Sequence, residues 1–170
     1  MCFNENLIEF FKKHNLYNKE MFKYFSENST MIDYRDDEQR VFIGTFYITD
    51  KNKKLTKIHL NIPYVFDDKT MLICIHEIVH AILLFNKIGH KLNLGIDYEA
   101  LPMLYEKIYI NDINTPEIIN YGRYLDSLIE EKDEQYVFGL RIRNDLLSCY
   151  DYNINSMERM VKKLTKKYKN

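Results

Sequence analysis

One apolar segment, residues 71–85, constrains the fold more than any other part of the chain. It is long enough for about four helical turns, and it is apolar on all sides, which is typical of a helix inside a protein core. His76, Glu77 and His80 interrupt it in the pattern H-E-x-x-H. Unpaired polar groups in a core cost about 1–3 kcal/mol each, so these three side chains require partners.

The spacing of the motif suits a metal ion. On a helix, His76 and His80 lie one turn apart on the same face, so both imidazoles can reach one ion. Glu77 lies about 100° further round the helix, where its carboxylate can take a proton from water. This pattern predicts metal-assisted hydrolysis. The alternative is a pair of core histidines bonded to backbone carbonyls, with Glu77 in an ion pair.

The composition predicts one soluble domain over residues 1–170. The apolar fraction of 46% supports a hydrophobic core, and the net charge of −1 with dispersed Lys and Arg argues against a nucleic-acid surface. No apolar run reaches the ~20 residues of a membrane span, and the N-terminus lacks the basic start of a signal peptide. The three cysteines have neither disulfide nor zinc-site spacing. We therefore expect a cytoplasmic protein without membrane or nucleic-acid partners.

Hydrophobic periodicity predicts an α+β fold. Segments 31–35, 40–49 and 55–62 are rich in β-branched and aromatic residues and are separated by polar turns, which predicts an antiparallel three-stranded meander. Helical spacing predicts one or two short helices over 6–16 and 19–25, and further helices at 71–85, 97–109, 116–131, 133–149 and 155–168. The expected architecture is a small antiparallel sheet packed on a mainly helical bundle.

Three helix starts carry recognisable signals. Asp67 or Asp68 is expected to cap the helix of the H-E-x-x-H motif, and Asp97 the helix that follows it. Asn155, with Glu158 three residues later, resembles a capping box for the last helix.

A hydrolytic zinc site takes three protein ligands and leaves the fourth position to water, so one ligand must come from outside the motif. Glu99 and Glu106 are candidates because they lie two turns apart on one face of helix 97–109. The alternative is that both are surface residues. His90 is expected to be a loop residue, because Leu83 and Asn86 stand where a longer histidine pattern requires Gly and His.

The motif and the stretch from Asp97 to Glu106 together resemble the gluzincin metallopeptidases, especially the thimet oligopeptidase and oligoendopeptidase F group. The resemblance covers about residues 70–110. It implies a zincin-like fold, a zinc ion held by His76, His80 and Glu99, and a supporting role for Glu106 behind the ligands. Val79 replaces the glycine usual before the second histidine, and the chain is far shorter, so a minimal version of that catalytic core is expected.

In that family, side chains on a later helix stabilise the charge that develops on the carbonyl oxygen. Our candidate is Tyr136, because Gly139 one turn later lets its helix approach another closely. The chain has 14 tyrosines, so the alternative is a ring packed in the core with its hydroxyl in water.

Together these features predict a zinc-dependent peptidase with Glu77 as general base and a peptide or protein as substrate. Strand 56–62 is expected to be an edge strand that binds an extended peptide beside the motif helix. Two alternatives remain open. One is a non-enzymatic or regulatory zincin-like metal-binding protein that acts on a protein partner. The other is a di-iron carboxylate protein built on Glu77-x-x-His80, which would need a second E-x-x-H that the chain lacks.

Overall fold

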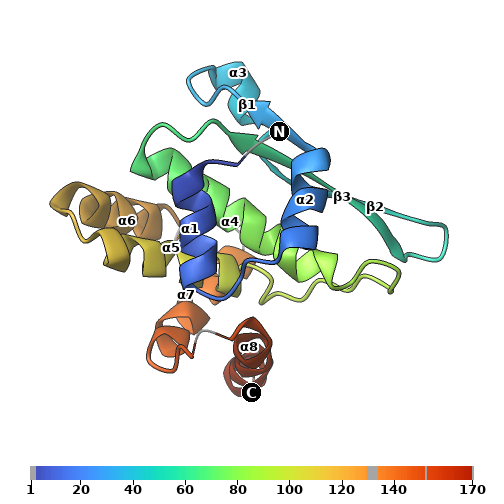
Figure 1. Cartoon of the computed structure of the whole chain (residues 1–170). Helices are drawn as coiled ribbons and strands as arrows, with labels where there is room; N and C mark the ends of the chain where they lie inside the picture. Colours follow the sequence, from blue (N-terminus) through green and yellow to red (C-terminus); the bar gives the residue numbers. More distant parts are fainter. Residues whose placement is uncertain (1–2, 130–133, 152, 170) are drawn as a thin grey trace. The chain divides into compact units, whose positions relative to one another are not determined.

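The computed structural model describes residues 3–129, 134–151 and 153–169. The chain forms two compact units, Met1–Asn93 (unit 1) and Leu94–Asn170 (unit 2). Within the described residues there are eight helices and one three-stranded sheet (Figure 1). The α+β class is therefore confirmed, whereas a single functional domain over residues 1–170 stays a prediction.

Unit 1 contains the sheet and the helix of the H-E-x-x-H motif. Its elements in chain order are α1 (Glu5–Lys13), α2 (Lys19–Glu27), β1 (Ser29–Ile32), α3 (Asp37–Arg40), β2 (Gly44–Thr49), β3 (Leu55–Pro63) and α4 (Asp68–Phe85). The helix α3 was expected to be a turn. It forms because the Asp36 carboxylate accepts a hydrogen bond from the Glu38 amide, which caps a single helical turn.

The sheet is mixed, with strand order β1-β3-β2, so the antiparallel meander is wrong. β1 runs parallel to β3, with Ser29 opposite Leu60, and β2 runs antiparallel to β3. A meander requires tight connections, but the segment between β1 and β2 includes α3 and is long enough to leave a place for β3 between them. The most apolar strand takes that place, since Ile58, Leu60 and Ile62 are all buried.

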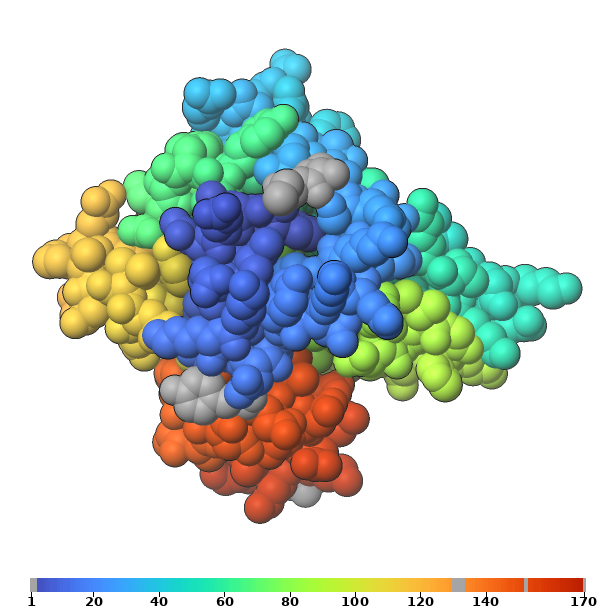
Figure 2. Space-filling view, in the orientation of Figure 1, coloured from blue at the N-terminus to red at the C-terminus, as the bar shows by residue number. Residues whose placement is uncertain are grey.

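This strand order also corrects the expectation about the sheet edge. The segment 56–62 lies in β3, which has a neighbour on each side and offers no free edge for a peptide. Within the described residues, β2 pairs with β3 alone and is an edge strand. The β2–β3 hairpin projects from the rest of unit 1 (Figures 1 and 2).

The helix α4 is the centre of the core of unit 1. It packs against β3, and it also contacts α1, α2 and β2 (Figure 1). The largest side chains that this packing removes fully from solvent are Phe11, Phe25, Leu7, Leu55, Ile58, Leu60, Ile62, Leu72, Ile75, Ile78 and Leu84. Burial of one such side chain contributes about 1.5–3 kcal/mol, so α4 is held mainly by its apolar neighbours.

A reciprocal cap begins α4, and it settles the choice between the two aspartates. The Asp67 carboxylate accepts a hydrogen bond from the Thr70 amide, and the Thr70 hydroxyl lies within bonding distance of the Asp67 amide. This is the capping box that fixes the first turn of a helix.

Among the described residues, no helix combines the length and the apolar character that crossing a membrane requires.

Unit 2 contains four helices: α5 (Ala100–Ile113), α6 (Pro116–Ile129), α7 (Glu134–Leu147) and α8 (Ile154–Lys169). The central one is α5, which packs against each of the other three.

Two of the helix caps expected from the sequence are wrong. The helix α5 begins after Glu99, and Asp97 instead accepts a bond from the Thr165 hydroxyl. Asn153, not Asn155, accepts the amide bonds at the start of α8.

A partly buried ion pair joins α6 to α7. Both terminal nitrogens of Arg143 donate to the two carboxylate oxygens of Asp126, at 2.6 and 3.0 Å. The Arg143 side chain is only 8% exposed, so its charge needs the Asp126 carboxylate, and the Asn144 side-chain oxygen accepts a further bond from it.

We expect Asp67→Ala to lower the free energy of unfolding by about 1 kcal/mol, because the first turn of α4 loses its cap. Urea denaturation followed by circular dichroism measures the change. Asp67→Asn keeps a capping side chain and is expected to stay within a few tenths of a kcal/mol of the parent protein. Equal losses in the two variants would contradict the assigned cap.

Candidate metal-binding and catalytic site

The two histidines of the motif face each other on α4. Their Nε2 atoms are 3.1 Å apart, and their ring centroids are 4.8 Å apart with the rings close to perpendicular. Two nitrogen ligands of one tetrahedral zinc ion, at about 2.0–2.1 Å from it, would lie about 3.3 Å from each other. The observed separation therefore fits two ligands of a shared ion, and it also fits one N–H···N hydrogen bond.

The motif lies on the accessible side of a helix that is otherwise largely buried. Ile73, His76 and Glu77 are half-buried, whereas the residues between and around them are buried. These three positions follow the i, i+3, i+4 spacing of one helical face, so they form a single stripe. His80 continues that stripe by one turn and is only 5% exposed. Small molecules can therefore reach the motif from one side.

Glu77 is held by a residue of β2. The Thr45 hydroxyl lies 2.8 Å from the Glu77 carboxylate oxygen Oε2 and 2.7 Å from the Glu77 main-chain oxygen. Both oxygens are acceptors, so the hydroxyl is the donor, and its single proton can bond to either of them. The edge strand thus contacts the residue that the sequence predicts as general base.

Cys74 lies on α4 three residues before Glu77, but it is unsuited to chemistry. Its side chain is fully buried, and its thiol donates weakly to the Pro63 carbonyl. Burial raises the pKa of the Cys74 thiol far above its usual value, and the nearby Glu77 charge raises it further. The thiolate that would bind a metal or attack a substrate is therefore not formed at neutral pH.

The other predicted site residues belong to unit 2. Glu99 immediately precedes α5 and is 4% exposed. A Cβ atom added at Gly139 would come within 3.1 Å of the Glu99 Cβ and 3.3 Å of the Ala100 amide nitrogen. The absence of a side chain at Gly139 therefore allows α7 to approach the start of α5 beside Glu99.

Tyr136 and Glu106 lie further along the same two helices. Tyr136 is half-buried and one turn before Gly139 on α7, on the side of that helix that faces the start of α5. Glu106 is half-buried and two turns beyond Glu99 on α5. His90 is exposed in the segment after α4, which is the loop position expected for it.

The predicted residues thus fall into two groups. Unit 1 brings together His76, Glu77 and His80, and unit 2 brings the helix of Tyr136 against the start of the helix that follows Glu99. Thr45 was not predicted, because it precedes Glu77 by 32 positions. Alternation in the strand suggests which face Thr45 occupies, but no local pattern pairs it with the motif.

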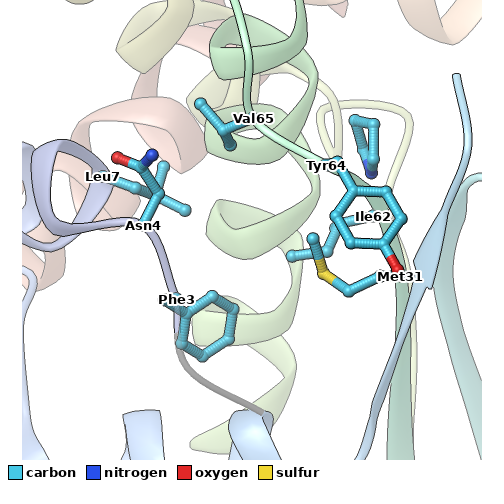
Figure 3. Close-up of a pocket in the computed structure, with 8 residues that line it drawn as sticks. Phe3, Asn4, Leu7, Met31, Ile62, Tyr64 and Val65 are labelled. Atoms are coloured by element: carbon cyan, nitrogen blue, oxygen red, sulfur yellow. The ribbon is translucent and has the colours of Figure 1, made fainter.

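Unit 1 also contains a pocket of ≈ 210 Å³ (Figure 3), and its lining includes none of these residues. It is formed by the start of α1 and the segment before it, by β1, and by the end of β3 with the two residues that follow. The residues that line it are Phe3, Asn4, Leu7, Met31, Ile62, Pro63, Tyr64 and Val65. None of the predicted site residues is among them, so the candidate site rests on the helix motif and not on this pocket.

No protein-family model, no curated protein and no solved structure matches this chain.

Alkylation of the native protein by iodoacetamide at mildly alkaline pH is expected to modify Cys149, which is exposed, and to spare Cys74. The raised pKa keeps Cys74 protonated there, and burial blocks the reagent. Peptide mass spectrometry after digestion reports each cysteine separately. Cys74 should react only after unfolding in urea, and equal labelling of the two cysteines in the native protein would contradict the burial of this face of α4.

Proposed function

We propose that the chain is a zinc-dependent peptidase in which His76, His80 and Glu99 hold the metal and Glu77 is the general base. Two imidazoles and one carboxylate are a donor set used by hydrolytic zinc sites, which keep one position open. As part of the same proposal, the α+β fold of this chain is a zincin-like fold. The observation that carries it is the 3.1 Å separation of the two Nε2 atoms on the accessible stripe of a buried helix.

When bound, zinc would supply a Lewis acid that polarises the substrate carbonyl and makes water more acidic. Glu77 would accept a proton from the attacking water as the water oxygen bonds to the carbonyl carbon. As the carbon–nitrogen bond breaks, Glu77 would return that proton to the leaving nitrogen. Tyr136 is the proposed donor to the oxygen on which negative charge develops, and Glu106 is the proposed support for the ligands.

The strand β2 is the proposed support for an extended substrate. Its free edge presents main-chain groups that can pair with a peptide, as in other proteins that bind a peptide by adding a strand. The bond from Thr45 to Glu77 attaches this edge to the residue that handles the proton. A peptide paired with β2 would therefore lie beside the proposed base, a position that β3 cannot offer because it is the central strand.

Two features favour hydrolysis over a purely structural metal site. A structural zinc site is closed by four protein ligands and has no use for a general base. Here the three proposed ligands would leave one position open, and Glu77 lies on the half-buried stripe of α4 rather than in its buried interior.

The metal is tested first. We expect the purified protein to bind one zinc ion per chain, as measured by elemental analysis and by calorimetric titration of the metal-free protein. Glu99→Ala should weaken the affinity about tenfold or more, because one ligand of three is lost. Glu117→Ala, at an exposed position on α6, is the matched control and should bind like the parent. A parent protein that takes up no zinc would overturn the proposed function.

The chemistry is tested with Glu77→Gln, which keeps the size of the side chain and removes its basicity. We expect kcat on a peptide selected from a library to fall by at least about a hundredfold, the usual contribution of a general base. Zinc content should stay at the parent level, since Glu77 is not a proposed ligand. A variant that binds zinc and cleaves as fast as the parent would exclude this mechanism.

A further inference from the structure

The contact between Thr45 and Glu77 is more than a link between a strand and a helix. A link to α4 needs only the main-chain oxygen of Glu77, which lies 2.7 Å from the Thr45 hydroxyl. The same hydroxyl is also 2.8 Å from the carboxylate oxygen Oε2. Because the two acceptors belong to one residue, the contact fixes the side chain of Glu77 relative to its own backbone.

Thr45 is held firmly enough in the sheet to orient the Glu77 side chain. Thr45 is the second residue of β2 and pairs with Leu60, which is fully buried at the centre of the sheet. Side chains alternate along a strand, so Thr45 and Tyr47 point toward α4, whereas Phe46 and Ile48 point to the opposite face. Threonine is also stiff at its first side-chain torsion, which limits the positions of the hydroxyl.

The chemistry of a hydroxyl also suits this place. A hydroxyl both donates and accepts hydrogen bonds. It can donate to the charged carboxylate of Glu77, and it can accept from the carboxyl group while donating to the main-chain oxygen. Thr45 can therefore keep its contact with Glu77 before and after a proton is taken up, without movement of the strand.

We propose that Thr45 is a positioning residue that holds the carboxylate of Glu77 in the orientation from which it takes a proton from water. This inference rests on the proposed function, because it assigns Thr45 a role in the same reaction. It adds a residue of the edge strand to the catalytic arrangement, so that substrate binding and base orientation depend on the same strand.

The variant that tests it is Thr45→Val, which keeps the branched shape and removes the hydroxyl. We expect kcat on the library-selected peptide to fall about tenfold, because a hydrogen bond to a charged group is lost, while KM changes by less than about twofold. Zinc content should equal that of the parent, since no ligand is touched. Thr45→Ser restores a hydroxyl at the same atom and is expected to recover most of the lost kcat.

A matched control is available in the same sheet. The Thr56 hydroxyl donates to the Ile48 main-chain oxygen at 2.9 Å, which links β3 to β2 without a carboxylate. Thr56→Val therefore removes a comparable sheet bond and should leave kcat within about twofold of the parent. A fall in kcat equal to that of Thr45→Val would mean that general damage to the sheet explains both, and the proposal would be overturned.

A crystal structure of Thr45→Val gives a readout that does not depend on activity. We expect the Glu77 carboxylate to leave its place in Thr45→Val and to keep it in Thr45→Ser. An unmoved carboxylate in Thr45→Val would overturn the positioning role even if the peptidase proposal holds. If Thr45→Val does not fold, Thr45→Ala and Thr45→Ser replace it as a pair that differs only in the hydroxyl, and equal kcat in the two would overturn the proposal.

The two proposals fail separately. A parent protein without zinc, or a Glu77→Gln variant as active as the parent, would remove the proposed function. Zinc binding with a large loss in Glu77→Gln, but an unchanged kcat in Thr45→Val, would remove only the role of Thr45.

Discussion

The burial of α4 is the constraint on which the rest of unit 1 depends. An apolar helix of 18 residues can be stable in water only if neighbouring elements cover it. The helices α1 and α2 and the strand β3 provide that cover, and their own apolar faces are buried by the same contacts. The one stripe of α4 that stays accessible carries His76 and Glu77. The packing thus separates the apolar sides of the helix, which stabilise the fold, from the side that is open to chemistry.

Long-range contacts then refine the positions of the polar groups. The hydroxyl of Thr45 reaches Glu77 from an edge strand. In unit 2, Gly139 lets α7 approach the backbone beside Glu99. Side chains that act in catalysis need a defined orientation, which locked neighbours and hydrogen-bonded partners can provide. In both units the contact comes from an element distant in the sequence, so Glu77 and the backbone beside Glu99 each have a neighbour that their own helix does not supply.

The sheet illustrates how a correct reading of strands can give the wrong topology. All three strands occur close to the predicted segments, because alternation and β-branched residues are local properties. Their order depends on the path of the connection between β1 and β2, which leaves a place for β3. Strand pairing depends on segments that are far apart in the sequence. The most apolar strand is most stable in the central position, where a strand on each side and α4 cover it. As a result, within the described residues, β1 and β2 are the edge strands and β3 has no free edge.

The sequence by itself determined the helix of the motif, a cap at Asp67 or Asp68, the exposed loop position of His90 and the α+β class, because these depend on periodicity and on contacts a few residues apart. It also identified the donor types and the spacing that favour a zinc site. Only the tertiary structure decided which side of α4 is accessible, which strands are at the edges of the sheet and which side chain contacts Glu77. These properties arise from packing between segments far apart in the chain, and such packing is selected by the total burial of apolar surface and not by any local pattern.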